Sequence, residues 1–222
     1  MKTGIVIENK TGSGWSLPVV LLLVGAVAIA AAIMQLTAIA DGLTSGMMPE
    51  DTRYIDHPVL PVLHLAPGIL FLLLGPLQFI SAYRQRWPGL HRFSGRIIIL
   101  SGILVGISAI AMSVNFPAAL SDMARAGNVT FGFAIIITLT IALAAILRRD
   151  VKRHRAWMIR SYVLGLTAAT MRLFVLPLFF MLGEEAIVTY AAYIIWINFL
   201  FNILVAELIL IRERRQQAIV VI

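Results

Sequence analysis

Six long apolar runs, separated by short charged connectors, dominate the sequence. Each run has about 20 or more residues, and a helix of that length crosses the roughly 30 Å hydrocarbon core of a bilayer. The chain is therefore predicted to be an all-α, polytopic membrane bundle, and its connectors are too short to hold a second domain. The six transmembrane helices are expected at about residues 17–38, 59–83, 93–115, 128–147, 156–182 and 186–211.

The composition agrees with a membrane protein. Hydrophobic residues make up 60% of the chain and charged residues 13%, against roughly 45–50% and 25% in ordinary soluble domains. The net charge is +7, but the basic residues lie in the connectors between the apolar runs and do not cluster on one soluble surface. This argues against nucleic acid as a partner. Cysteine is absent, so a redox function would require a bound cofactor.

The charges of the connectors predict the topology. The connector after the first run and the turn at 183–185 are acidic, whereas those after the second, fourth and sixth runs are basic. Because basic connectors remain in the cytoplasm, both termini are predicted to be cytoplasmic, as a lead at 1–16 and a tail at 212–222. The expected location is the bacterial cytoplasmic membrane, with anionic lipid headgroups as partners on the inner side.

The first run could also be read as a signal peptide, because Ala38-Ile39-Ala40 resembles a signal-peptidase site. However, the apolar run before it exceeds the roughly 7 to 15 residues of a signal-peptide core. We therefore expect a retained first helix.

Two basic helix starts resemble each other. His91-Arg92 and His154-Arg155 each precede a glycine, Gly102 and Gly165, by the same spacing. One explanation is a duplicated helical hairpin. The other is that basic helix starts recur under the positive-inside rule alone.

The sequence also resembles a bacterial family of predicted membrane proteins catalogued as a domain of unknown function. The resemblance covers roughly residues 58–210 and leaves out the first helix. It implies a shared set of polar positions but no reaction. The residues that carry it are His64 with Gly68, Gly75-Pro76-Leu77-Gln78-Phe79, His91-Arg92 with Gly95-Arg96, His154-Arg155 with Trp157-Met158, Arg160-Ser161 and Arg172.

Arg172 is the strongest functional signal, because it lies deep inside the fifth apolar run. A charge at that depth is costly in lipid and is expected to face a protein interior or a wet cavity. His154 and Arg172 are 18 residues apart, or about five helical turns, so a continuous helix would place both on one face.

Counting inward from the outer helix ends at about 1.5 Å per residue places several polar residues in the outer half. This predicts a ligand-binding pocket between the second, fifth and sixth helices, containing Gln35, His64, Arg172 and Asn198. The alternatives are structural: Arg172 could bond carbonyls near Pro177 or hold helices together through Asn198, and His64 could bond a carbonyl loosened by a proline.

A second candidate site lies at the inner helix starts. Two helix N-termini and four arginines would suit phosphate or lipid headgroups, although simple interfacial anchoring explains the same residues. The residues are His91, Arg92, Arg96, His154, Arg155 and Arg160. Glu207 is a carboxylate within an apolar run, and it is expected either to pair with Arg160 or to relay protons.

Three classes of function are compatible with these residues. The first is a protein that binds b-type haem, a quinone or a similar ligand, with His64, His91 and His154 as metal ligands only if haem is bound. The second is a transporter or lipid-handling protein for an anionic substrate. The third is an accessory subunit without a ligand, in a homo-oligomer or a larger membrane complex. No motif assigns an enzymatic reaction.

Overall fold

A computed structural model describes residues 16–43, 52–116 and 121–219, in which every regular element is an α-helix. Most of the expected lead at 1–16, part of the first acidic connector and the last residues of the tail lie outside these ranges. The helices are α1 (Ser16–Ala40), α2 (Arg53–Asp56), α3 (Val59–Gln78), α4 (Ser81–Arg86), α5 (Pro88–Asn115), α6 (Asp122–Leu147), α7 (Val151–Gly165), α8 (Thr167–Leu182) and α9 (Glu184–Ile219).

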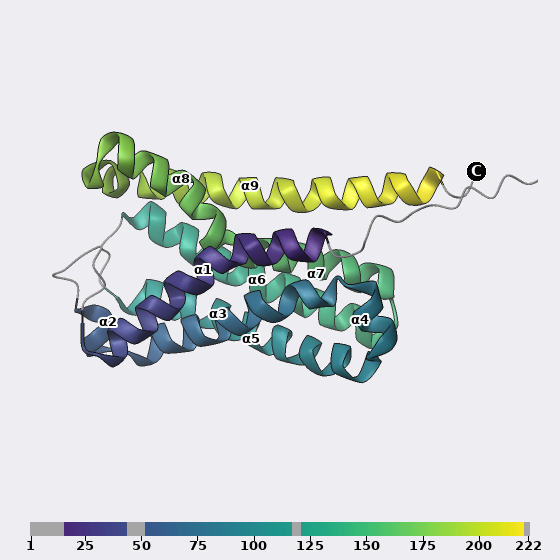
Figure 1. The fold of residues 1–222 in the computed structure, drawn as a ribbon. Helices are drawn as coiled ribbons and strands as arrows, with labels where there is room; N and C mark the ends of the chain where they lie inside the picture. Colours follow the sequence, from purple (N-terminus) through teal and green to yellow (C-terminus); the bar gives the residue numbers. More distant parts are fainter. Residues whose placement is uncertain (1–15, 44–51, 117–120, 220–222) are drawn as a thin grey trace, which may run out of the picture.

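The described helices confirm the six-span, all-α prediction. Six helical segments are long and apolar enough to cross a membrane: Pro18–Ala40, Val59–Gln78, Pro88–Asn115, Asp122–Leu147, Val151–Leu182 and Thr189–Arg215. They run roughly parallel to one long axis in Figure 1. Helices that follow one another in sequence pack together, α3 on α5, α5 on α6 and α6 on α7. The first helix, α1, packs on α3, and α9 packs on α6, α7 and α8.

Several helix ends differ from the predicted ones. The second span ends at Gln78 rather than at residue 83, because Ile80 adopts an extended conformation before the short helix α4 begins. The third helix begins at Pro88, where the missing N–H of proline costs nothing at a helix start. The fourth begins at Asp122, six residues early, and the Ser121 hydroxyl accepts a hydrogen bond from the Ala124 N–H as its cap.

The fifth span is not one continuous helix, contrary to the prediction. It breaks at Leu166 between α7 and α8, so His154 and Arg172 lie on two different helices. At the break, the Ala169 N–H bonds the Leu166 carbonyl three residues back instead of four, at 2.8 Å. The Thr167 hydroxyl also donates to the Leu164 carbonyl, at 2.5 Å. Local hydrogen bonds of this kind compete with the regular helix.

In the core, a tyrosine ring packs against a helix at a position where glycine leaves space for it. Tyr162 of α7 is 2% exposed, and a Cβ atom on Gly75 of α3 would lie 2.0 Å from its ring. Pro76 has no N–H to bond the Leu72 carbonyl four residues earlier, and the Tyr162 hydroxyl donates to that carbonyl at 3.1 Å. This contact fixes α7 against α3, whose helix continues through Pro76 to Gln78.

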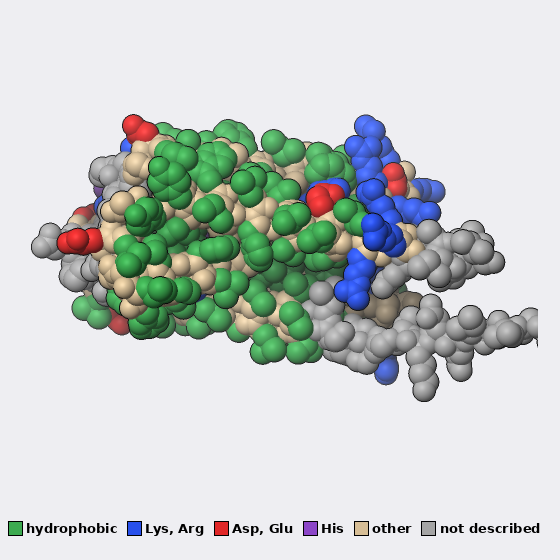
Figure 2. All heavy atoms as spheres, turned by 90° about the horizontal axis from the view of Figure 1, so that it is seen from above, with side chains coloured by type: hydrophobic (Ala, Val, Ile, Leu, Met, Phe, Trp, Pro, Cys, Tyr) green, Lys and Arg blue, Asp and Glu red, His purple; other side chains and the backbone are tan. Residues whose placement is uncertain are grey.

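The two ends of the bundle differ in charge. Figure 2 shows hydrophobic side chains over the middle of one face, Lys and Arg side chains gathered at one end, and some acidic side chains at the other. Helices α3, α6 and α9 end at the basic end, and α7 begins there (Figure 1). We refer to the two ends as the basic end and the opposite end.

Candidate functional site

Two adjoining cavities lie in the half of the bundle near the opposite end. The larger has a volume of about 720 Å³ and lies between α1, α3, α5 and α8. The smaller has a volume of about 430 Å³ and reaches α6 and α9. Both sizes are usual for small-molecule sites. The cavities share a wall formed by Tyr54, His64, Val105, Met112, Ile135, Gly165 and Ala168, and we call the pair the joined cavity.

His64 lies where the two halves of the joined cavity meet. It is part-buried on α3, and its Nδ1 atom lies 3.2 Å from the Val105 carbonyl oxygen and 3.1 Å from the Ser108 hydroxyl, both on α5. These contacts hold the imidazole ring across the α3–α5 interface. His64 is therefore both a structural bridge between α3 and α5 and a lining residue of the cavity, and its partner is a carbonyl of α5 rather than one loosened by a proline of its own helix.

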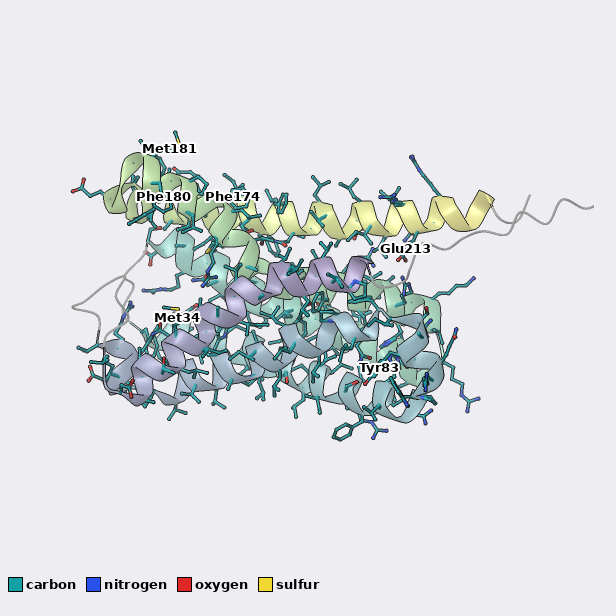
Figure 3. All side chains as sticks on the ribbon, in the orientation of Figure 1. Met34, Tyr83, Phe174, Phe180, Met181 and Glu213 are labelled. Carbon is teal, nitrogen blue, oxygen red and sulfur yellow. The ribbon has the colours of Figure 1, made fainter. Side chains whose placement is uncertain are left out.

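Arg172 also lines the larger half of the joined cavity. Its Nη1 atom donates to the carbonyl of Ala168, one turn earlier on α8. Gln35 of α1 lines the same half. Its neighbour Met34, which also lines that half, is labelled on α1 in Figure 3. The structure thus brings together three of the four predicted ligand-binding residues, from three different helices.

Asn198, the fourth predicted residue, does not line either cavity. It is fully buried on α9, where its Nδ2 atom donates to the Thr167 carbonyl at 3.1 Å. Its Oδ1 atom accepts from the Thr170 hydroxyl at 2.8 Å and from Asn202 Nδ2 at 3.1 Å. Asn198 therefore belongs to a polar network that joins α9 to α8, and this network does not include Arg172.

Several lining residues were not predicted from the sequence. Arg53, Arg125, Asn128 and Ser113 line the smaller half of the joined cavity. Arg125 and Asn128 lie near the start of α6, in a stretch that hydropathy assigned to a connector and a helix end. A polar helix turn in the headgroup region carries no hydropathy signal, but the Ser121 cap could have identified it.

The joined cavity is mainly apolar and carries positive charge. Three arginines line it, Arg53, Arg125 and Arg172, and no carboxylate does so among the residues that the structure describes, although Arg125 lies 3.7 Å from the carboxylate of Asp122, which does not line the cavity. The Nε atom of Arg125 is buried without a hydrogen-bond partner in the described part of the chain. The lining favours a ligand with an apolar body and oxygen atoms that accept hydrogen bonds.

The basic end contains two ion pairs between α7 and α9 among the described residues. Arg160 makes a two-pronged contact with Glu207, with Nε–Oε1 and Nη2–Oε2 distances of 2.6 and 3.0 Å. This confirms the expected pairing. Arg155 contacts Glu213 of α9 in the same way, at 3.2 and 2.5 Å. Figure 3 shows Glu213 at the same end of the molecule as Tyr83 of α4.

The other members of the predicted inner site divide between exposed and part-buried positions. Arg92 and Arg96 are exposed on α5. His154 is part-buried, and its Nδ1 atom lies 2.8 Å from the Ala142 carbonyl oxygen on α6. The Nδ1 atom of His91 has no hydrogen-bond partner among the described residues.

The histidines do not form a two-imidazole haem clamp in the joined cavity. Among its described lining residues His64 is the sole histidine. His64 contacts α5 at Val105 and Ser108, about four turns along that helix from His91, a separation of roughly 20 Å. A haem held by two histidines needs both rings at one depth, so His64 cannot share a haem with His91. No group of three metal-ligating side chains occurs within the described ranges.

The fold and the joined cavity define a multi-pass helical membrane protein with a mainly apolar cavity, lined by a few polar side chains, in one half of its bundle. The chain belongs to the family described as predicted membrane protein (DUF2306), which matches residues 61–210. The family region contains His64 and Arg172 but not α1, which carries Gln35. Comparison with the curated proteins and with the solved structures found no match.

Proposed function

We propose that this protein binds a lipid-soluble quinone in the joined cavity. The observation that carries the proposal is that Gln35, His64 and Arg172, from three helices and distant in sequence, line one mainly apolar cavity. A quinone presents a flat apolar ring, a hydrocarbon tail and two carbonyl oxygens. Arginine and amide side chains donate hydrogen bonds to such oxygens, and the apolar walls accommodate the ring and the tail.

The position of the cavity between α1, α3 and α8 suits a ligand that arrives from the bilayer. The α1 side of the larger half is lined by small apolar residues, Ala28, Ala31, Ala32 and Ala38, which leave room beside Gln35. Since redox chemistry in a chain without cysteine requires a carried group, a quinone would supply it. The proposed setting is the bacterial cytoplasmic membrane, with Arg92 and Arg96 facing anionic headgroups at the basic end.

A second candidate is an anionic amphiphile, either carried across the membrane or held within it. The observation that favours it is the lining of three arginines without a described carboxylate. A carboxylate or phosphate head would be attracted to Arg172, with its apolar tail along the apolar walls of the larger half of the cavity. A quinone and an anionic amphiphile differ in charge, so salt distinguishes them: binding of the anion weakens as ionic strength rises.

The test is ligand analysis of protein purified in mild detergent from a quinone-containing bacterial membrane. An ultraviolet-visible spectrum of the extract and a native mass spectrum of the protein report bound quinone or lipid. We expect a quinone at about one molecule per chain. Arg172→Ala should weaken rebinding of a short-chain quinone by roughly tenfold or more, because a hydrogen bond from a charged donor contributes about 1.5–3 kcal/mol.

Arg96→Ala is the matched control, because it removes an exposed arginine that lines neither half of the cavity. It should bind quinone as the wild type does. If wild type carries no quinone and does not bind an added one, the proposal is wrong. Retention of a fatty acid or phospholipid instead, sensitive to salt and to Arg172→Ala, would establish the anionic alternative.

A further inference from the structure

The hydrogen bonds around His64 determine which of its nitrogens carries a proton. Nδ1 faces two oxygen atoms of α5, the Val105 carbonyl at 3.2 Å and the Ser108 hydroxyl at 3.1 Å. A carbonyl oxygen accepts hydrogen bonds and cannot donate them. The first contact is therefore favourable only if Nδ1 bears a hydrogen.

The Ser108 hydroxyl does not reverse this assignment. Its oxygen lies 2.7 Å from the Leu104 carbonyl and 3.0 Å from the Val105 carbonyl, so its single hydrogen is directed to the backbone of its own helix. Ser108 is buried, and it can offer His64 only a lone pair. Both neighbours of Nδ1 are consequently acceptors.

The same imidazole ring has no carboxylate to stabilise a positive charge. Arg172 lines the same half of the joined cavity as His64, and no described lining residue of the cavity is acidic. A further cation would be opposed by like charges. In the neutral ring the proton lies on Nδ1, which leaves Nε2 with an unshared electron pair and no hydrogen.

We infer that the joined cavity is built for a ligand that donates a hydrogen bond to His64 Nε2, so that it takes the quinol form in preference to the quinone. This inference rests on the proposed function and adds the oxidation state of the ligand. A quinol has two O–H groups. One can donate a hydrogen bond to Nε2, and the oxygen of the other can accept hydrogen bonds from Arg172 or Gln35, which line the same half of the cavity. A quinone would place a carbonyl oxygen against the Nε2 electron pair, which is repulsive.

Binding of both redox forms tests the inference. Titration of the full chain in detergent or nanodiscs with decyl-ubiquinol and with decyl-ubiquinone, without oxygen, gives the two dissociation constants. We expect wild type to favour the quinol roughly tenfold, the equivalent of one hydrogen bond. His64→Asn should bring the two constants to within about twofold of each other, because the amide nitrogen of Asn can replace the Nδ1 donor, whereas its oxygen, on a shorter side chain, does not reach the position of Nε2.

His57→Asn is the matched control, because His57 is exposed at the end of α2 and lines neither half of the cavity. It should keep the quinol preference. Nitrogen-15 spectra of histidine-labelled protein provide a readout that does not depend on a ligand, and the signals missing in His64→Asn identify those of His64. A protonated Nδ1 and an unprotonated Nε2 are expected.

The outcomes separate the inference from the proposed function. If a proton is found on Nε2, or if quinone binds as tightly as quinol to wild type, the inference is overturned while quinone-class binding stands. If neither form binds, the proposed function and the inference fail together. A preference for quinol that survives in His64→Asn would also overturn the assignment to His64.

Discussion

Pro76 illustrates how a membrane helix tolerates a proline. In lipid every backbone group needs a partner inside the protein, and a proline leaves one carbonyl without its usual N–H. Here the freed carbonyl is that of Leu72, and a tyrosine hydroxyl from another helix satisfies it at 3.1 Å. Gly75 makes this contact possible, since any Cβ atom there would overlap the Tyr162 ring. The Gly-Pro pair is thus a docking point for α7.

Removal of the Tyr162 hydroxyl should destabilise the bundle. In Tyr162→Phe the ring still fills its space, but the Leu72 carbonyl is left buried without a donor. We expect a loss of about 1–3 kcal/mol in the free energy of unfolding, measured by denaturation in mixed detergent micelles. Tyr193→Phe, at an exposed tyrosine of α9, should leave stability unchanged. Equal stability of Tyr162→Phe and wild type would show that the bond contributes nothing.

Polar residues within a single apolar run could be assigned a height from the sequence, but not a direction. Counting residues placed Gln35, His64 and Arg172 in the outer half, and all three line the joined cavity. The same count also places Asn198 in the outer half, yet its side chain points into the α8–α9 interface. Height follows from the rise per residue, whereas direction depends on helix rotation, which neighbouring helices determine.

The α8–α9 pair is held together by a buried polar network. Thr170, Asn198 and Asn202 are each no more than 8% exposed, and their amide and hydroxyl groups bond one another at 2.8 to 3.1 Å. Since α8 also lines the joined cavity, this network helps to position Arg172 in the lining of that cavity. Figure 3 shows Phe174, Phe180 and Met181 on the part of α8 that leads to the opposite end.

Asn198→Leu should loosen α8 from α9. The change leaves the Thr167 carbonyl without its side-chain donor and removes the acceptor of the Thr170 hydroxyl. Polar contacts between membrane helices contribute on average about 0.6 kcal/mol each, so we expect a loss of roughly 1–2 kcal/mol. Unfolding in mixed micelles measures it. The control is Asn115→Ala at an exposed position of α5, and a similar loss in both variants would argue against a specific network.

The helices differ in how far the sequence could predict them. Hydropathy identified all six spans because each apolar run is long. It missed the break at Leu166, since the run from Ala156 to Leu182 is apolar on both sides of it. The Thr167 hydroxyl bonds the Leu164 carbonyl at that break, and the Phe71 ring packs against Gly165 beside it, where a Cβ atom would lie 2.2 Å from the ring. Such packing becomes visible only in three dimensions.

The charge difference between the two ends should determine how the whole molecule inserts. Basic residues gather at the end where α7 begins and α9 ends (Figure 2). The positive-inside rule therefore predicts that both termini are cytoplasmic. The native chain has no cysteine, so each introduced cysteine can report its own location.

Labelling of intact cells with a membrane-impermeant thiol reagent tests this orientation. Asp122→Cys lies at the opposite end, where the aspartate side chain is 96% exposed, and Lys152→Cys lies at the exposed basic end. We expect Asp122→Cys to react in intact cells and Lys152→Cys to react only after the membrane is opened. The reverse pattern would show that the joined cavity faces the cytoplasmic half.

The central claim is that the joined cavity holds a quinone, and photolabelling tests it most directly. Full-length protein in bacterial membranes would be labelled with a short-chain azidoquinone and digested, and the modified residues mapped by mass spectrometry. We predict that the label falls on lining residues of α1, α3, α5 and α8 and that unlabelled quinol competes with it. Label spread evenly over lipid-facing residues, or confined to the basic end, or not displaced by quinol, would contradict the claim.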